Sequence, residues 1–260
     1  MQIMELTFSA LMGIPLVEPE DNVAQLILDA AEANQKKIIA NDVIVIAQKI
    51  VSKAENRYVV LDSVTPSEEA IKLSLEVQKD PRYVELVLRQ SNTVIRKKPN
   101  VLIVEHELGF IHANAGMDQS NIEHPDGQER VLLLPKDSDA SAEKIRQYVQ
   151  QKLGVNVGVI INDSMGRAWR NGTLGLAIGV AGFNALENYV GGQDIFGREL
   201  VVTEVAAADE MAAGASLVMG QTQEKTPVVL VRGYQPTEPS DPAEQGVKPL
   251  LRPKELDLFR

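Results

Sequence analysis

The segment 157–172, VGVIINDSMGRAWRNG, limits the possible folds of this chain more than any other part of it. It begins with a run of apolar, mostly β-branched residues, which is typical of a strand that is covered on both faces. The run stops at Asp163, so the sequence predicts a carboxylate at the end of a buried strand. Ser164 follows, and Arg167 and Arg170 then stand on either side of Trp169, the one tryptophan of the chain. This order suggests a place for a metal ion beside a place for an anionic substrate.

A second acidic position lies in the segment 114–121, NAGMDQSN, where Asp118 is surrounded by amides and a hydroxyl. The glycine predicts a turn, and Asn121 and Ser164 could add neutral oxygen ligands to the two carboxylates. Mg2+ and Mn2+ bind one or two carboxylates together with phosphate oxygens and water, so the two positions suggest divalent-metal chemistry on a phosphorylated substrate. In the alternative interpretation, Asp118 is a turn residue and Asp163 is a helix cap.

Helices and strands are predicted in an irregular order along the rest of the chain. The patterns predict helices after an N-cap at Asp21, from the start signal Thr65-Pro66-Ser67-Glu68, and over 83–90, 142–153 and 203–218. They predict strands at 43–46, 101–104, 110–113, 131–134 and 227–231. The chain has neither GxxxxGK(S/T) nor GxGxxG after a strand, which argues against a P-loop enzyme and a Rossmann dehydrogenase. We predict an α+β fold with mixed sheets and flanking helices.

Large and small side chains alternate along 174–181, LGLAIGVA. A period of two predicts a strand with one bulky face and one nearly bare face. A bare face allows something to pack very close, and the candidates are a helix, another sheet, a subunit or a flat ligand. Packing against a helix is the favoured interpretation.

Composition and charge exclude several classes of function. The chain has no cysteine, so disulfides, thiolate zinc sites, iron–sulfur clusters and a cysteine nucleophile are excluded. Its net charge of −10 argues against nucleic-acid binding. The N-terminus lacks the basic region of a signal peptide, and no apolar stretch is long enough to span a membrane. We expect a soluble cytoplasmic protein.

The basic and imidazole side chains give weaker signals. Lys49 and Lys53 follow a buried strand at a four-residue spacing, which would place both on one helix face as a phosphate clamp, although surface lysines are common. Arg167 and Arg170 suit an anionic group of a substrate, and ordinary surface pairing explains them equally well. The three histidines, His106, His112 and His124, have no metal-like spacing, so we expect them to be structural or exposed. The pair Asp209-Glu210 is expected on an exposed helix face.

Several segments, taken in order, resemble the coenzyme F420:L-glutamate ligase family, also called the F420-0 gamma-glutamyl ligases. The matching segments are 13–17, 47–55, 114–121, 163–172, 194–200 and 219–221, with a similar ending at 252–260. They cover most of residues 13–233. The resemblance implies a family-specific ligase domain over 1–233, with room for two intertwined subdomains, and a proline-rich extended tail over 234–260.

The resemblance also implies an activity. Such an enzyme uses GTP to join L-glutamate to the carboxylate of the F420 precursor, through an acyl phosphate, and adds later glutamates in gamma linkage. It implies Mg2+ or Mn2+, two ions per site, K+ as a helper, and a homodimer. The metal residues would be Asp118, Asp163, Ser164 and Gln221, with Asp118, Asp163 and Lys53 in the chemistry. The nucleotide would contact Ile14, Pro15, Leu16, Val17, Gln48, Lys49, Lys53, Asn121, Met219, Gly220, Gln221 and Thr222, within a segment that extends to Thr226.

Two departures from the family pattern stand out. Gln221 occupies a position where some relatives carry a glutamate, so one metal would lose a charged ligand. The segment 221–225 has no glycine, which is unusual for a loop that wraps a nucleotide. Three alternatives remain open: a metal-dependent phosphohydrolase, a non-catalytic protein that binds a nucleotide or a deazaflavin, and a ligase that acts on a modified precursor.

Overall fold

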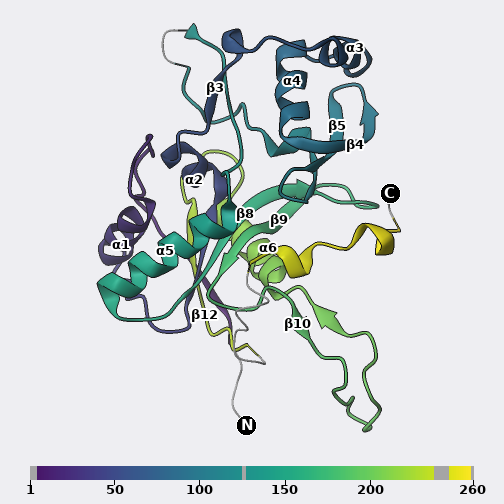
Figure 1. Ribbon diagram of the computed structural model, residues 1–260. Coiled ribbons are helices and arrows are strands. Elements are labelled where there is room, and N and C mark those ends of the chain that lie inside the picture. The colour runs from purple at the N-terminus through teal and green to yellow at the C-terminus, as the bar shows by residue number, and fades with distance from the viewer. Residues whose placement is uncertain (1–4, 125–126, 237–245, 259–260) are drawn as a thin grey trace.

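The computed structural model describes residues 5–124, 127–236 and 246–258 of the chain, and its centre is a five-stranded sheet. The strand order is β1-β12-β2-β8-β9, and only β2 and β8 run parallel. Helices and antiparallel strands surround this sheet (Figure 1), which confirms the predicted α+β class. The strands are β1 (Thr7–Ala10), β2 (Val43–Ala47), β8 (Gly158–Gly166), β9 (Thr173–Ala181) and β12 (Val228–Arg232).

The two central strands are the apolar runs that the sequence singled out. Residues Val43–Ile46 of β2 are fully buried, and Ile44 pairs with Val159 of β8. Strand β8 does not stop at Asp163, so that prediction is wrong. It continues to Gly166, because its antiparallel pairing with β9 extends as far as Thr173. Asp163 is therefore a strand residue opposite Leu176, and the helix-cap interpretation is also wrong.

Strand β9 packs closely against two helices, as the favoured interpretation of its small residues required. A side chain at Gly175 would meet Ser216 and the carbonyl of Ala212 in α6 (Ala207–Met219). A side chain at Gly179 would instead meet Ser138 at the start of α5 (Ser138–Leu153). The small residues do not form the single bare face that was predicted. A register shift beside Ile161 adds one residue to β9, which changes the phase of the alternation.

Helix starts differ from prediction by one or two residues. The N-cap of α1 (Val23–Ala33) is Asn22 rather than Asp21, and its side chain accepts the N–H of Gln25. Helix α3 (Glu68–Val77) is capped by Ser67, whose hydroxyl accepts the N–H of Ala70. Both segments offer more than one capping side chain, so the sequence alone does not choose between them.

A second, smaller group of elements stands above the sheet in Figure 1 and has its own hydrophobic core. Helix α3 and α4 (Pro81–Arg89) cover the sheet β4-β5-β6, formed by Ser91–Lys98, Val101–His106 and Ile111–Ala113. The strand pair β3 (Tyr58–Val60) and β7 (Arg130–Leu132) joins this group to the body. Helix α2 (Gln48–Ala54) follows β2 directly and lies at the junction of the two groups.

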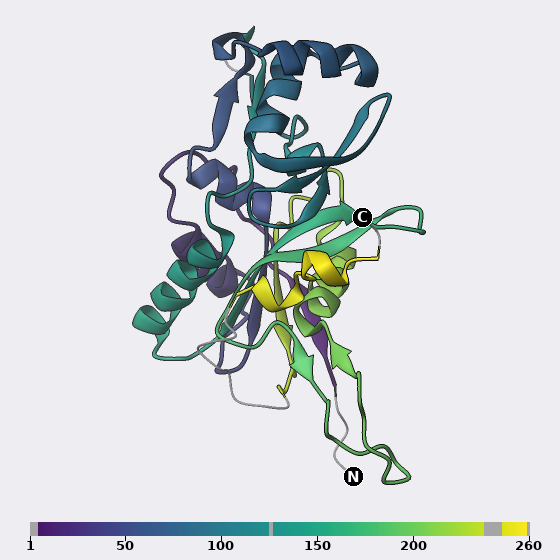
Figure 2. The same ribbon diagram turned by 45° about the vertical axis from the view of Figure 1, so that its right-hand side comes forward.

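Two peripheral segments complete the fold. The chain from β10 (Glu187–Asn188) to β11 (Glu204–Val205) forms a long arm that projects away from the body (Figure 2). The C-terminal segment lies against the body, and its short 3-10 helices, Lys248–Leu250 and Lys254–Leu256, depart from the extended tail that was predicted. The prolines at 239 and 242 lie outside the described residues. None of the described helices has both the length and the apolar character required for a membrane span.

Candidate functional site

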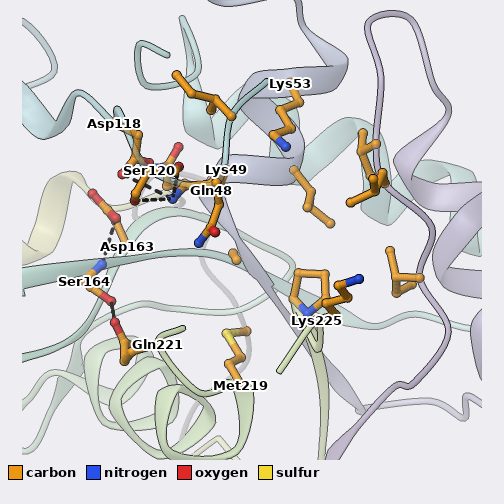
Figure 3. A pocket seen from close by; sticks show the side chains of 18 of the residues that line it. Gln48, Lys49, Lys53, Asp118, Ser120, Asp163, Ser164, Met219, Gln221 and Lys225 are labelled. Carbon is orange, nitrogen blue, oxygen red and sulfur yellow. Dashed lines mark hydrogen bonds and ion pairs between the residues drawn. The ribbon is translucent and has the colours of Figure 1, made fainter. Parts of the chain in front are cut away.

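A large cavity opens where the two groups of elements meet. Its volume is about 1020 Å³. Helix α2, the loop around Asp118, the middle of β8 and the loop after α6 form its walls (Figure 3). Every residue predicted for the metal ions and the nucleotide lines this one cavity: Ile14, Pro15, Leu16, Val17, Gln48, Lys49, Lys53, Asp118, Asn121, Asp163, Ser164, Met219, Gly220, Gln221 and Thr222.

Asp118 is placed by a tight turn. The short helix Asn114–Gly116 has left-handed backbone conformations throughout, and Asp118 then forms a bridge to Leu132 with two backbone hydrogen bonds of 2.9 Å. Its carboxylate points to the start of α2. Oδ2 accepts a hydrogen bond from Gln48 Nε2 at 2.7 Å, and Oδ1 lies 3.3 Å from Lys49 Nζ.

Asp163 is held by a histidine that was expected to be structural or exposed. His112 Nε2 lies 2.9 Å from Asp163 Oδ2, while Oδ1 accepts the backbone N–H of Ser164 at 2.8 Å. His112 Nδ1 lies 2.9 Å from the carbonyl oxygen of Ala113. Both partners of the ring are oxygen acceptors, an arrangement that favours the doubly protonated, positively charged imidazole. Burial lowers the pKa of His112, but the hydrogen bond and charge of Asp163 outweigh it and the pKa is raised.

The loop after α6 closes the third side of the cavity. Helix α6 ends at Gly220, whose φ of 73° with ψ of −179° is a conformation that glycine alone adopts easily. The next residue, Gln221, accepts a hydrogen bond from Ser164 Oγ at 2.9 Å through its side-chain oxygen. Asn121 Nδ2 donates to the carbonyl of Thr222 at 3.3 Å, which joins this loop to the one that carries Asp118.

The charges of the cavity are imperfectly balanced. Burial raises the pKa of Asp118, Lys49 opposes this rise, and the negative charge of Asp163 adds to it. Burial lowers the pKa of Lys53, and the nearby charge of Lys49 lowers it further. Asp118 therefore lacks part of the positive charge that would stabilise its carboxylate, and Lys53 lacks part of the negative charge that would stabilise its ammonium group. A divalent cation and a polyphosphate would together supply both.

The donor atoms fit a hard divalent cation. Asp118 and Asp163 lie on the same side of the cavity, and Ser164 and Gln221 add a hydroxyl and an amide oxygen below them (Figure 3). No group of three or more acidic or histidine side chains suited to a metal exists in the described part of the chain. Two carboxylates with neutral oxygens are a set that Mg2+ or Mn2+ completes with phosphate oxygens and water.

The other predicted residues have different positions. Arg167 and Arg170 do not line the cavity but lie at the exposed turn between β8 and β9. Asp209, expected on an exposed helix face, is partly buried and accepts the N–H of Ala177 at 2.9 Å. The cavity also contains Tyr58, His112 and Glu123, which sequence reasoning missed. Tyr58 is far in sequence from both acidic motifs, whereas His112 and Glu123 stand two residues before and two residues after the segment 114–121, and no local pattern marks any of the three as a site residue.

Comparison with known proteins agrees with this geometry. The family model described as F420-0:Gamma-glutamyl ligase matches residues 12–233. A coenzyme F420:L-glutamate ligase of Methanothermobacter thermautotrophicus is 44% identical over 248 residues, 95% of this chain and 96% of the relative. A protein of the same name from Methanocaldococcus jannaschii is 44% identical over 227 residues, 87% of each chain, and one from Methanopyrus kandleri is 41% identical over 244 residues, 94% and 93%. The match extends over both groups of elements and all walls of the cavity, and the chain belongs to the F420-0:gamma-glutamyl ligase family.

Proposed function

We propose that this protein is a GTP- and divalent-metal-dependent ligase that joins L-glutamate to the carboxylate of the F420 precursor. One observation carries the proposal: two aspartates and two lysines from distant segments converge in one cavity, in a chain whose relatives are named coenzyme F420:L-glutamate ligase. A carboxylate does not react with an amine until it is activated. A site that binds a triphosphate beside the carboxylate supplies that activation.

The cavity has a different character at its two ends. The segment Ile14–Val17 presents apolar side chains, among them Leu16, which is 66% exposed. Such a surface suits the flat base of a nucleotide. Lys49 and Lys53, one helical turn apart on α2, suit the phosphates. The terminal phosphate would then lie at Asp118 and Asp163, beside the acceptor.

The reaction follows in two steps. A carboxylate oxygen of the acceptor attacks the terminal phosphorus of GTP, the bond to the bridging oxygen breaks, and GDP leaves. The amine of glutamate then attacks the acyl carbon, the bond to the phosphate oxygen breaks, and inorganic phosphate and a proton are released. Divalent ions held by Asp118, Asp163, Ser164 and Gln221 would neutralise charge on the phosphate oxygens.

The protein side chains contribute binding and orientation. Lys53 lies in the cavity, and burial lowers its pKa. A phosphate oxygen bound beside its ammonium group would stabilise the charged form. Lys49 already bridges Asp118 and the carbonyl oxygen of Ser120, at 3.3 and 3.1 Å. This contact holds the acidic loop against α2 until the phosphates arrive. A homodimer, K+ as a helper ion, and addition of a second glutamate in gamma linkage belong to the same proposal.

The first test is a mass-spectrometric assay of the purified protein with the glutamate-free precursor, L-glutamate, GTP and Mn2+. A product heavier by one or two glutamyl units, formed only with GTP and lost in Asp163→Asn, is the expected result. Asp29→Asn, on the exposed face of α1, is the matched control. Release of phosphate without added mass would favour a phosphohydrolase. Tight binding without turnover would favour a binding protein.

A further inference from the structure

Arg130 is the one arginine among the described residues that line the cavity. It is the first residue of β7, where it pairs with Val60 of β3. The next residue, Val131, is buried in the core of the smaller group of elements. Neighbouring side chains of a strand point to opposite faces, so the side chain of Arg130 points away from that core. It therefore belongs to the wall of the cavity and not to the packing of the smaller group.

The side chain of Arg130 has no polar partner in the part of the protein that the structure describes. Its Nε is buried and donates to no acceptor there, and its guanidinium forms no ion pair. A buried N–H without an acceptor is rare in native structures and costs free energy. An anionic group that enters the cavity with a ligand would supply both the acceptor and the counter-charge.

The strand register places Arg130 close to the acidic end of the cavity. Leu132, two residues further along β7, stands directly opposite Asp118 on one side and Tyr58 on the other. Residues that pair directly share a face of the sheet, and so do residues two apart on one strand. Asp118 and Arg130 are therefore diagonal neighbours on one face, about 7–8 Å apart.

Electrostatics agree with this placement. Burial raises the pKa of Tyr58, and the negative charge of Glu123 raises it further. The positive charge of Arg130 opposes this rise, so its guanidinium lies near the phenol that lines the same cavity. An arginine that influences a group of the cavity through its charge would influence a bound anion in the same way.

Among the proposed substrates, L-glutamate is the one whose charges still lack a partner. Its amine would lie beside the activated carboxylate at Asp118, but each of its two carboxylates needs a donor. Arg167 and Arg170, which the sequence suggested for an anionic group, lie at an exposed turn outside the cavity. Four single bonds separate the amine of L-glutamate from its farther carboxylate carbon, a span of roughly 5 Å. A cation at the position of Arg130 suits that span.

The type of side chain also favours a carboxylate over a phosphate. The guanidinium is planar and offers two parallel N–H groups, which match the two oxygens of a carboxylate. The phosphates of the nucleotide already have the two lysines of α2, which act as compact point charges. Both kinds of anion present oxygens to a cation, so the experiment has to separate them.

We propose that Arg130 binds a carboxylate of L-glutamate and so sets the preference of the enzyme for an acidic amino acid. This inference rests on the proposed function, because the identity of the amino acid comes from it. Arg130 is a substrate-binding residue in this scheme, and it takes no part in the transfer of the phosphoryl group.

Steady-state kinetics of glutamylation give the first test. Arg130→Ala should raise KM for L-glutamate by about 10- to 100-fold, the usual value of a hydrogen bond to a charged group. KM for GTP should stay as in the wild type. Arg130→Lys keeps the charge but loses the planar fork, so it should recover part of the loss. Arg96→Ala, which removes an exposed arginine of β4, is the matched control and should behave as the wild type does.

Two amides of glutamate show whether the contact is direct. L-Glutamine lacks the charge of the side-chain carboxylate, and L-glutamate 1-amide lacks that of the α-carboxylate. Each is measured as a substrate or as a competitor of L-glutamate. Arg130→Ala should weaken one amide as much as L-glutamate and leave the other unchanged, because the second has already lost the group that Arg130 binds. An equal loss for all three compounds would make Arg130 a structural residue and overturn the inference.

The remaining outcomes separate this inference from the proposed function. Unchanged KM for L-glutamate in Arg130→Ala, with glutamylation intact in the wild type, would overturn the inference alone. Weaker binding of GDP and Mn2+ in Arg130→Ala, with unchanged KM for L-glutamate, would assign the residue to a phosphate and also overturn it. Equilibrium dialysis with labelled L-glutamate, GDP and Mn2+ needs no turnover. Retention of L-glutamate that depends on Arg130, in a protein that adds none to the precursor, would keep the inference and reject the ligase.

Discussion

His112 and Asp163 form a partly buried contact between two different sheets, with 2.9 Å between Nε2 and Oδ2. His112 belongs to β6 in the smaller group of elements, and Asp163 belongs to β8 in the central sheet. The contact therefore fixes the rotamer of an acidic side chain of the cavity and also joins the two groups of elements on which the cavity depends.

The first prediction concerns this pair. His112→Ala should weaken Mn2+ binding in the presence of GTP by about 10- to 100-fold. Mutation of a residue that orients a metal ligand usually lowers the metal affinity by that factor. Electron paramagnetic resonance of free Mn2+ gives the affinity directly. His124→Ala, which removes an exposed histidine, is the control. Equal Mn2+ affinity in His112→Ala and the wild type would show that His112 does not orient Asp163 for metal binding.

The second prediction concerns Gln221. Its side-chain oxygen already accepts a hydrogen bond from Ser164 Oγ, so a carboxylate fits the same position. Gln221→Glu should tighten Mn2+ binding by roughly tenfold, because charged ligands raise the affinity of a divalent site. Gln223→Glu adds the same charge two residues later in the same loop and serves as the control. If both variants tighten binding equally, the effect is a general one of charge and Gln221 is no ligand.

Sequence alone predicted Asp118 and Asp163 as site residues because each stands beside a strong local signal. Asp118 follows a glycine turn, and Asp163 follows the apolar run that becomes β8. Local signals also predicted the central strands and most helices. The length of β8 was wrong because its final residues are held by pairing with β9, a contact that depends on the partner strand rather than on the apolar pattern.

The position of His112 in the cavity could not be predicted from the sequence. It is 51 residues from Asp163, and its neighbours give no metal-like spacing. Its position in the cavity follows from the packing of β6 against β8, which no local pattern records. The phase change in β9 has the same origin, because the bulge beside Ile161 is a property of the strand pair and not of either strand.

The third prediction concerns the close packing of β9 on α6. A Cβ atom at Gly175 would lie 2.4 Å from the carbonyl oxygen of Ala212, and backbone cannot move aside cheaply. Gly175→Ala should therefore destabilise the protein by about 1–3 kcal/mol, measured by urea unfolding. Gly166→Ala is a matched control on β8, since nothing lies within 4 Å of its added side chain and its φ is ordinary. Equal stability of the two variants would mean that α6 shifts easily away from the sheet.

The last prediction concerns His106, at the end of β5, which is 1% exposed. Burial, followed by the charges of His112 and Arg57, lowers its pKa to about 4. Its Nδ1 accepts the N–H of Leu108 at 3.0 Å, which requires the neutral ring with its proton on Nε2. In the unfolded chain the pKa returns to about 6.5, so below that pH the unfolded state binds more protons than the folded state.

Stability should therefore fall as the pH drops from 7 towards 4, and this one group should account for roughly 2–3 kcal/mol of the loss. Asparagine offers an acceptor in a similar place and does not titrate, so His106→Asn should lose less stability over the same range. Urea unfolding of both proteins at pH 7 and pH 4.5 gives the comparison. The quantity compared is the change in the free energy of unfolding between the two pH values within each protein. Any effect of the substitution that does not depend on pH therefore cancels. The same pH dependence in both proteins would show that His106 accepts a proton in the folded state as readily as in the unfolded chain.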